Sequence, residues 1–484
     1  MRRNLFLLAA TAVMTAAGAR AAELWVGAAQ ADITPDRPVA LTGGMTAPIS
    51  KGVNSRVTAN VLAIEARTNG APADCAILVS CDLCVIRPGI QARFRERVAP
   101  RLPGFDISKL FLAATHTHKA PAIDQEAYDS YAGAIEPKEY VPFLFDRMAE
   151  AVVKAWEGRQ PGAFAWGLGH AVVAQNRRAV YADGSAVMYG KSDTEPFRGL
   201  EGYEDHAVDS LFFLDARKRL TAVAVTVPCP AQTDERGLCG PRVSADFWHD
   251  VREGLRERYG SGLTVLGFVG PAGDQSPHLM LRHASETRMA RLRGVSRTQE
   301  MGRRIVRAVA ETWEAVQTDV RADVPFAHRV ERFDLPERAV TEPEYAEAKK
   351  AHDLLAAKER LTGQDHWRKR WHKRVVDRFE TQKNGGTVNP VELHALRLGD
   401  VAVVTNPFEL YTDYGMRIQG RSPAGQTVLI QLASPVDKAY YLPTPRALAG
   451  KGYSAIPQSC LVGPEGGQML VERTLAAIKG LFGK

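Results

Sequence analysis

The stretch KLFLAATHTHKAP, residues 109–121, joins a short apolar run to two histidines one residue apart. The run LFLAA predicts a buried strand that ends in polar residues. Side chains two positions apart on a strand share a face, so we expect His116 and His118 to project together. Open α/β sheets bind ligands beyond the carboxyl ends of their strands, which is where this pair falls. The pair is therefore a candidate metal or acid–base site, with two histidines hydrogen-bonded to local backbone as the simpler alternative.

Around this stretch, apolar strand patterns alternate with helical patterns from about residue 24 to residue 335. Strands return after residue 390, and residues 466–483 form a final helical pattern. The alternation predicts an α/β (α+β) fold with a large mixed β-sheet flanked by helices. Length alone would suggest two or three domains, but no Pro/Gly/Ser-rich linker divides the chain. We therefore expect one large domain over residues 22–484.

Residues 339–383 differ from the rest because they are dense in charge and read as two helices. Trp367, Trp371, Val375 and Phe379 recur every four residues and form one apolar stripe beside arginines and lysines. Such a stripe either lies on a membrane or lipid surface or packs on the main domain. The simpler of the two interpretations is a charged helical insertion whose stripe is packed.

Residues 1–21 contain Arg2 and Arg3, then an apolar core, then the small-residue pattern Ala19-Arg20-Ala21. This order is typical of a signal peptide cut near Ala21, which predicts an exported protein, periplasmic or secreted. The formal charge of +7 falls to +4 when the three arginines of this segment are removed. That excess is too small to indicate a nucleic-acid partner, although it permits peripheral contact with an anionic membrane. No later segment has the apolar length of a membrane span.

Six cysteines in a chain of this length do not form a dense disulfide framework. The motif CDLC, residues 81–84, has the spacing of a metal or redox pair, yet it lies within a strand pattern. Residues three apart on a strand face opposite ways, so we expect Cys81 and Cys84 to be core residues. Cys229 and Cys239 flank a polar loop where export permits a disulfide, although the sequence does not determine the pairing.

Three further polar stretches follow predicted strands. GFVGPAGDQSPHL, residues 267–279, places Ser276 in a Gly/Pro loop whose backbone can approach a ligand closely. A serine there acts either as a nucleophile or as a hydrogen-bond donor, and it is not the G-x-S-x-G nucleophile elbow. Residues 401–411 end a strand at Glu409, and residues 434–455 carry Tyr441 and Tyr453 in a turn-rich segment.

Taken in order, these stretches resemble the neutral/alkaline (non-lysosomal) ceramidase family. The resemblance spans most of the chain after the signal segment and corresponds to the family's N-terminal catalytic domain alone. The ordered set is far more specific than any single motif. In chain order, the matching motifs are VGAAQADITPD (26–36), VSCDLCVI (79–86), THTH (115–118), Asn176-Arg177, GDQSP (273–277), Pro407-Phe408-Glu409, and Tyr441 to Thr444 with Tyr453 beyond.

This resemblance implies an exported zinc-dependent amidohydrolase that cleaves the N-acyl amide of ceramide or a related N-acyl compound. One zinc per chain would polarise the carbonyl and lower the pKa of water toward neutrality. The implied roles are metal ligation by His116, Glu409 and Tyr441, catalysis by His118, Arg177 and Ser276, and substrate binding by Asp274 and Tyr453.

The sequence also departs from the family pattern. Pro230 stands where the family has its remaining histidine ligand, and proline cannot ligate a metal through its side chain. Gln232, His249 and His278 are the candidate substitutes for that ligand. KAPAID replaces a glycine-rich tail after THTH, and His278 replaces an asparagine. The alternative function is therefore a catalytically inactive ceramidase-fold protein that binds lipid or another ligand. The sequence does not indicate the oligomeric state.

Overall fold

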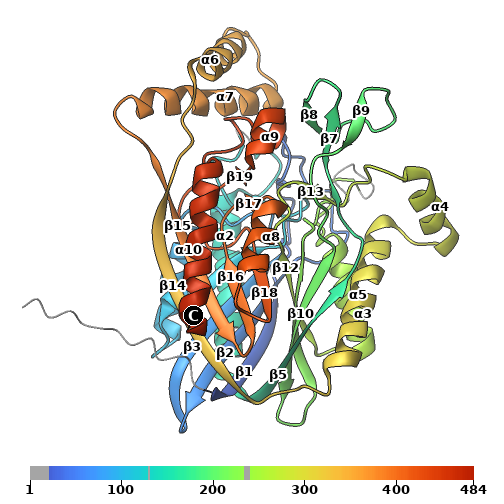
Figure 1. Ribbon diagram of the computed structural model, residues 1–484, viewed down its shortest axis with the longest axis vertical. Coiled ribbons are helices and arrows are strands. Elements are labelled where there is room, and N and C mark those ends of the chain that lie inside the picture. The colour runs from blue at the N-terminus through green and yellow to red at the C-terminus, as the bar shows by residue number, and fades with distance from the viewer. Residues whose placement is uncertain (1–20, 129–130, 234–239, 484) are drawn as a thin grey trace, which may run out of the picture.

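The computed structural model describes residues 21–128, 131–233 and 240–483, and its centre is a twelve-stranded mixed sheet (Figure 1). The main path runs β12-β11-β10-β5-β1-β14-β15-β16-β18, and β2, β3 and β4 continue from the other edge of β1. The strands of this sheet are β1 (Ala21–Asp32), β2 (Thr58–Thr68), β3 (Ala71–Cys81), β4 (Leu110–Ala114), β5 (Gln160–His170), β10 (Ala207–Asp215), β11 (Leu220–Val227), β12 (Thr264–Val269), β14 (Asp323–Pro336), β15 (Val388–Leu398), β16 (Val401–Thr405) and β18 (Gln426–Ile430).

All twelve strands contribute to one apolar interior, because each turns one face inward. Phe111, Phe213 and Phe268 are fully buried there and come from three different parts of the chain. The alternation of side chains along each strand leaves a second apolar face, which must also be covered. The predicted α/β fold with a large mixed sheet flanked by helices is thus confirmed.

Helices cover the outer faces in three groups. The helix α2 packs on β1 and β2, α3 and α5 pack on the β5–β12 region, and α8 and α10 pack on the β14–β18 region. The helices are α1 (Ile90–Val98), α2 (Pro137–Glu157), α3 (Phe247–Tyr259), α4 (His283–Arg293), α5 (Arg297–Val316), α6 (Glu342–Ala356), α7 (Gly363–Gln382), α8 (Thr412–Arg421), α9 (Pro445–Gly450) and α10 (Pro464–Phe482), with 3₁₀ turns η1 (Ala99–Arg101), η2 (Ile107–Lys109) and η3 (Tyr453–Ala455). No described helix combines the length and apolarity that crossing a bilayer requires.

Within the described chain, three neighbouring pairs of the large sheet run parallel: β3 with β4, β11 with β12, and β16 with β18. Short ladders hold the loop after β12, where β13 pairs with β6, and the loops after β16 and β18, where β17 pairs with β19. The short strands are β6 (Gln175–Asn176), β7 (Arg178–Tyr181), β8 (Ala186–Met188), β9 (Phe197–Leu200), β13 (Gln275–Ser276), β17 (Glu409–Leu410) and β19 (Tyr441–Leu442).

The helices α6 and α7 form a separate layer beyond the main body, at the top of Figure 1. Val375 and Phe379 of α7 are buried against Val340 and Ala348. The Trp371 ring instead lies 6.0 Å from the Tyr453 ring, in a stacked arrangement. The apolar stripe is therefore divided between α6 and the main domain, as expected for a packed insertion.

Two strand boundaries differ from expectation. The strand β3 ends at Cys81, so Cys84 lies on a bend and not within a strand. The strand β4 ends at Ala114, and His116 has a left-handed backbone with φ 64°. The buried ends of both strands continue as irregular backbone that remains buried, which an apolar pattern alone does not distinguish from a strand. Residues 1–20 of the predicted signal segment 1–21 lie outside the described residues, whereas Ala21 begins β1. Cys239 also lies outside them, and with it the predicted Cys229–Cys239 disulfide.

A fully buried ion pair joins the ends of these strands. Arg252 of α3 donates to both carboxylate oxygens of Asp82, at 2.7 and 2.9 Å. Asp82 also accepts from the backbone and hydroxyl of Thr58 and from the hydroxyl of Thr115. Five hydrogen bonds thus satisfy one carboxylate that has no exposed surface.

Replacing Asp82 by asparagine should leave the Arg252 charge buried without a counter-charge. Losing one member of such a pair costs about 3–5 kcal/mol. We expect Asp82→Asn to lower the free energy of unfolding by that amount in urea titration. The exposed Asp36 provides a matched control, since Asp36→Asn should change it by less than about 0.5 kcal/mol. Equal unfolding midpoints for the two variants would contradict this account.

Candidate metal centre

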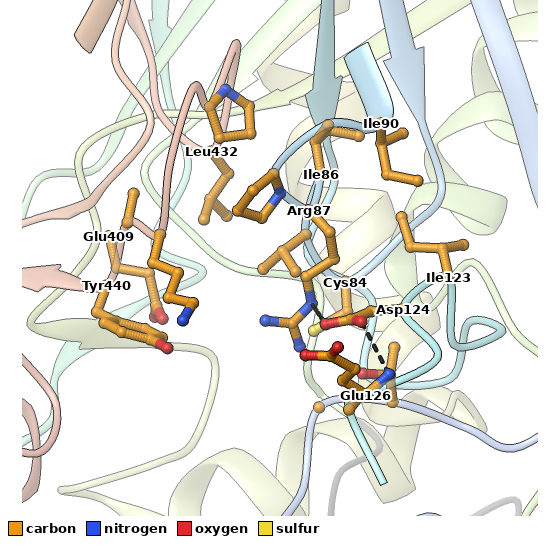
Figure 2. A pocket seen from close by; sticks show the side chains of 18 of the residues that line it. Cys84, Ile86, Arg87, Ile90, Ile123, Asp124, Glu126, Glu409, Leu432 and Tyr440 are labelled. Carbon is orange, nitrogen blue, oxygen red and sulfur yellow. Dashed lines mark hydrogen bonds and ion pairs between the residues drawn. The ribbon is translucent and has the colours of Figure 1, made fainter. Parts of the chain in front are cut away.

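The carboxyl ends of two of the parallel pairs, β3 with β4 and β16 with β18, open onto one cavity of about 930 Å³. The bend after β3 contributes Cys84, and the loop after β4 contributes His116 and His118. Glu409 of β17 and Tyr441 of β19 follow β16 and β18. Figure 2 shows Cys84 on one side of the cavity and Glu409 on the other. Residues far apart in the sequence therefore meet because their strands end at the same place.

The two histidines converge within this cavity. The Nδ1 of His116 donates a hydrogen bond to the carbonyl of Cys84 at 2.6 Å. The Nε2 of the same ring therefore carries the lone pair that can bind a metal ion. That Nε2 lies 3.2 Å from His118 Nε2 and 3.7 Å from Glu409 Oε2. Zinc bonds of about 2.0–2.1 Å in tetrahedral array place donor atoms roughly 3.3 Å apart. His116 has a left-handed backbone, which is a strained conformation for a residue other than glycine. Strained residues of this kind are common at functional sites.

Cys84 is an additional donor beside the two histidines. Its ligand atom lies within 4.8 Å of ligand atoms of His116 and His118, and the three residues form a group that could hold a metal ion. Burial raises the pKa of the Cys84 thiol, but His118 and His116 outweigh it and bring that pKa down to about 6. The thiolate is the form that binds metals. The CDLC spacing indicated that Cys84 could bind a metal. The expectation of a continuous strand instead assigned Cys84 to the core.

Glu409 and Tyr441 are paired in register between two parallel short strands. Arg177 lies behind them, with its Nη2 3.1 Å from the Tyr441 hydroxyl and 3.7 Å from Glu409 Oε2. Burial raises the pKa of Tyr441 well above its usual value, and Glu409 raises it further against the opposing effect of Arg177. Tyr441 is therefore a neutral phenol at neutral pH. Because Arg177 donates to its oxygen, the phenolic proton is available to another acceptor.

Ser276 is fully buried and does not line the cavity. Its hydroxyl lies 2.6 Å from His278 Nδ1 and accepts a hydrogen bond from the Tyr189 hydroxyl at 3.3 Å. The Tyr189 hydroxyl in turn accepts from Arg177 Nη1 at 3.0 Å and from Gln232 Nε2 at 3.1 Å. Tyr189, which no sequence pattern indicated, thus connects Ser276 to Arg177 and lies between them.

The three candidate substitutes for the missing histidine ligand lie outside the cavity wall. Gln232 bonds to Tyr189, His278 bonds to Ser276, and His249 is exposed on α3. The loop that carries Pro230 nevertheless touches the histidine loop, since the Ala231 backbone N–H donates to the Thr115 carbonyl at 3.3 Å. Cys84 approaches the same histidines from the bend that follows β3.

Asp274 and Tyr453 occupy different environments. The buried Asp274 accepts from the backbone and hydroxyl of Thr412 and from the side chain of Asn176, so it anchors the start of α8. Burial raises the pKa of this carboxyl. Tyr453 lines the cavity, and its ring lies 5.8 Å from that of Tyr441.

Gly43 is a further residue that sequence reasoning missed. It has a φ of 116°, and a Cβ at this position would lie 2.4 Å from Cγ of His118. Both facts require glycine, because other residues disfavour this backbone and would displace the imidazole. The position of the His118 imidazole thus depends on the loop that contains Gly43, which is distant in the sequence.

Two solved structures resemble this one closely in fold. The crystal structure of neutral ceramidase from Pseudomonas aeruginosa superposes with a TM-score of 0.69 and 19% sequence identity, covering 95% of this chain and 74% of that one. A ceramidase complexed with C2 gives a TM-score of 0.66 and 18% identity, covering 95% and 75%. No protein-family profile and no curated protein matches the sequence. The chain therefore has the fold of neutral ceramidase, as the ordered motifs predicted.

The residues at this site fit a zinc ion. Two imidazoles, a carboxylate and a thiolate face one cavity, and these are the donor types that zinc prefers. The hydrogen bond from His116 Nδ1 to a backbone carbonyl is the outer contact that usually orients a ligating histidine. His116 would hold the ion together with His118, Glu409 or Cys84.

Cobalt substitution should reveal whether Cys84 is a ligand. With cobalt in place of zinc, we expect a thiolate-to-metal charge-transfer band in the near ultraviolet that Cys84→Ser abolishes. The substitution should also weaken metal affinity by at least about tenfold, since even changes to a ligand's partner have that effect. The buried Cys460, which does not line the cavity, serves as the control in Cys460→Ser. A band that persists in Cys84→Ser would exclude Cys84 from the coordination sphere.

Proposed function

We propose that the protein is a metal-dependent amidohydrolase that cleaves the N-acyl amide of ceramide or a related N-acyl compound. The convergence of His116 Nε2, His118 Nε2 and the Glu409 carboxylate in one cavity wall carries this proposal. The neutral ceramidase fold supports the reaction class. The apolar part of the cavity suits an acyl chain.

Zinc bound at this site would supply Lewis acidity that polarises the amide carbonyl and promotes attack by water. Glu409 would hold the ion through its carboxylate, and His116 through Nε2. Arg177 keeps Glu409 and Tyr441 in position, because one guanidinium nitrogen faces both and also donates to the Gly273 carbonyl. Burial of these groups excludes water from one side of the site and strengthens their interactions with the substrate.

Tyr441 is the residue best placed to stabilise negative charge on the amide oxygen. It lines the cavity, stays protonated, and receives its own hydrogen bond from Arg177. Its phenolic proton can therefore be donated to the developing oxyanion. Ser276 does not face the substrate directly and affects the site through its hydrogen bond with the Tyr189 hydroxyl.

Two substitutions test this assignment. Loss of one donor to an oxyanion typically lowers the rate about 100- to 1,000-fold, so Tyr441→Phe should lower kcat by that factor while metal content stays unchanged. Ser276→Ala should lower kcat by about tenfold or less, because Ser276 is buried behind Tyr189. Release of laurate from an N-lauroyl substrate measures both, with elemental analysis in parallel. A larger loss in Ser276→Ala than in Tyr441→Phe, or an acyl-enzyme trapped on Ser276, would make the serine the nucleophile.

The second candidate function is a binding protein that has lost the chemistry. Pro230 at the position of a ligand histidine favours it. In that case the protein would bind N-acyl lipids and release no fatty acid at any zinc concentration. About one zinc per chain after purification, together with turnover, would instead support the enzyme.

We also propose that the protein acts outside the cytoplasm. The support is the sequence of residues 1–21, with Arg2 and Arg3 before an apolar core and Ala19-Arg20-Ala21 at its end. Mass spectrometry of the mature protein should give an N-terminus at or near Ala22. Intact protein that retains Met1 and fractionates with the cytoplasm would refute export.

A further inference from the structure

The cavity has two chemically unlike sides. Ile86, Ile90, Ile123 and Leu432 form an apolar lining, and Figure 2 shows these four side chains together on one side and above. Glu409 and Tyr440 lie on the opposite side. Arg87, Asp124 and Glu126 lie below the isoleucines on the same side, so the apolar surface that a substrate meets is the part formed by the isoleucines and Leu432.

Two cations on the polar side have no carboxylate of a described residue within ion-pair distance. Arg374 of α7 donates from Nη1 to the Tyr440 hydroxyl at 2.7 Å, which leaves its positive charge unneutralised. Lys438 lines the cavity two residues before Tyr440 and is exposed. Among the described residues, no carboxylate oxygen lies within 4.0 Å of the Arg374 or Lys438 side-chain nitrogens. Arg374 and Lys438 are called here the cationic pair.

Three other cations that line the cavity have partners within the protein, and the carboxylates of Glu126 and Asp437 also line it. Lys373 pairs with Asp377 at 2.7 Å, and Arg87 approaches Asp124 at 3.9 Å. The guanidinium of Arg370 donates to the carbonyls of Glu126 and Ala127. The cationic pair is thus distinct from the lysine and arginines around it, which have partners within the protein.

A row of aromatic rings connects α7 with the reacting end of the cavity. Trp367 and Trp371 lie 5.3 Å apart, Trp371 lies 6.0 Å from Tyr453, and Tyr453 lies 5.8 Å from Tyr441. This row holds α7 against the main domain on the side of Tyr441. The arginine that α7 contributes to the cationic pair is therefore part of the same wall as Glu409 and Tyr441.

We infer that the substrate is an N-acyl compound whose amine-derived part carries an anion, such as the carboxylate of an N-acyl amino acid, and that Arg374 and Lys438 bind this anion. The acyl chain would lie on the isoleucine side, and the amide would lie near His116 and Tyr441. Hydrolysis adds one water across the C–N bond, giving a fatty acid and an amino acid whose anion stays with the cationic pair. Cleavage rests on the proposed function, whereas recognition of the anion does not.

Two matched probes separate recognition from cleavage. N-lauroylglycine carries a carboxylate, and N-lauroylglycinamide has the same chain without the charge. The preference of the protein is the ratio of kcat/KM for the two if laurate is released, and the ratio of Kd from calorimetry if it is not. We expect at least about a tenfold preference for N-lauroylglycine, as two partly exposed charge-assisted contacts would produce. Added salt should reduce this preference.

Substitution should remove the preference without removing the fold. In the double variant R374Q/K438Q, we expect the ratio to fall to about threefold or less, with unchanged affinity for N-lauroylglycinamide. The exposed Arg368 of α7 does not line the cavity, so Arg368→Gln is the matched control and should keep the full ratio. Retention of secondary structure by circular dichroism verifies each variant.

The outcomes are distinct for the two proposals. A ratio near one in the unmodified protein, or an unchanged ratio in R374Q/K438Q, would overturn the inference even if ceramide is hydrolysed. A preference that depends on the cationic pair, without any release of laurate, would support the inference and reject the amidohydrolase.

Discussion

The buried carboxylate of Asp82 is the constraint on which the site depends. Asp82 receives Arg252 from α3, Thr58 from β2 and Thr115 from the loop after β4. Cys84 follows two residues later, and His116 follows Thr115 directly. The Asp82 carboxylate thus positions two of the candidate metal ligands, Cys84 and His116. Because this carboxylate is fully buried, it cannot move into solvent. Removal of either charge would leave the other buried without compensation.

Much of the architecture could be read from the sequence, because apolar runs of strand length alternate with helical patterns. The same logic located His116 and His118, since both follow a strand, whereas Glu409 and Tyr441 were implied by the resemblance to the ceramidase family. Cys84 was assigned to the core because a buried bend has the same composition as a buried strand. Tyr189 and Gly43 have left-handed backbones and matter through distant partners, so no local pattern marks them. The missing histidine at Pro230 was visible in the sequence, but the approach of Cys84 to the two histidines depends on tertiary structure.

The polar groups behind the cavity form a connected series and not a set of independent contacts. Arg177 reaches Tyr441 with one nitrogen and Tyr189 with another, and Tyr189 reaches Ser276. His278 closes the series with its contact to Ser276. Such a series orients its hydroxyl groups, because Tyr189 has both donors and an acceptor within it and Tyr441 accepts from Arg177. The orientation of Tyr441 toward the cavity follows from it.

The helices α6 and α7 are carried at the tip of the long antiparallel pair β14 and β15, which stay in register from Phe326–Leu398 to Pro336–Val388. The helix α7, which lines one side of the cavity, lies at the end of this ribbon, whereas His116 and His118 follow β4. The helix α7 also contacts the main domain through the Trp371 and Tyr453 rings and through the hydrogen bond from Arg374 to Tyr440. A change in the length of β14 and β15 would therefore shift α7 relative to Tyr440 and Tyr453, and with it one wall of the cavity.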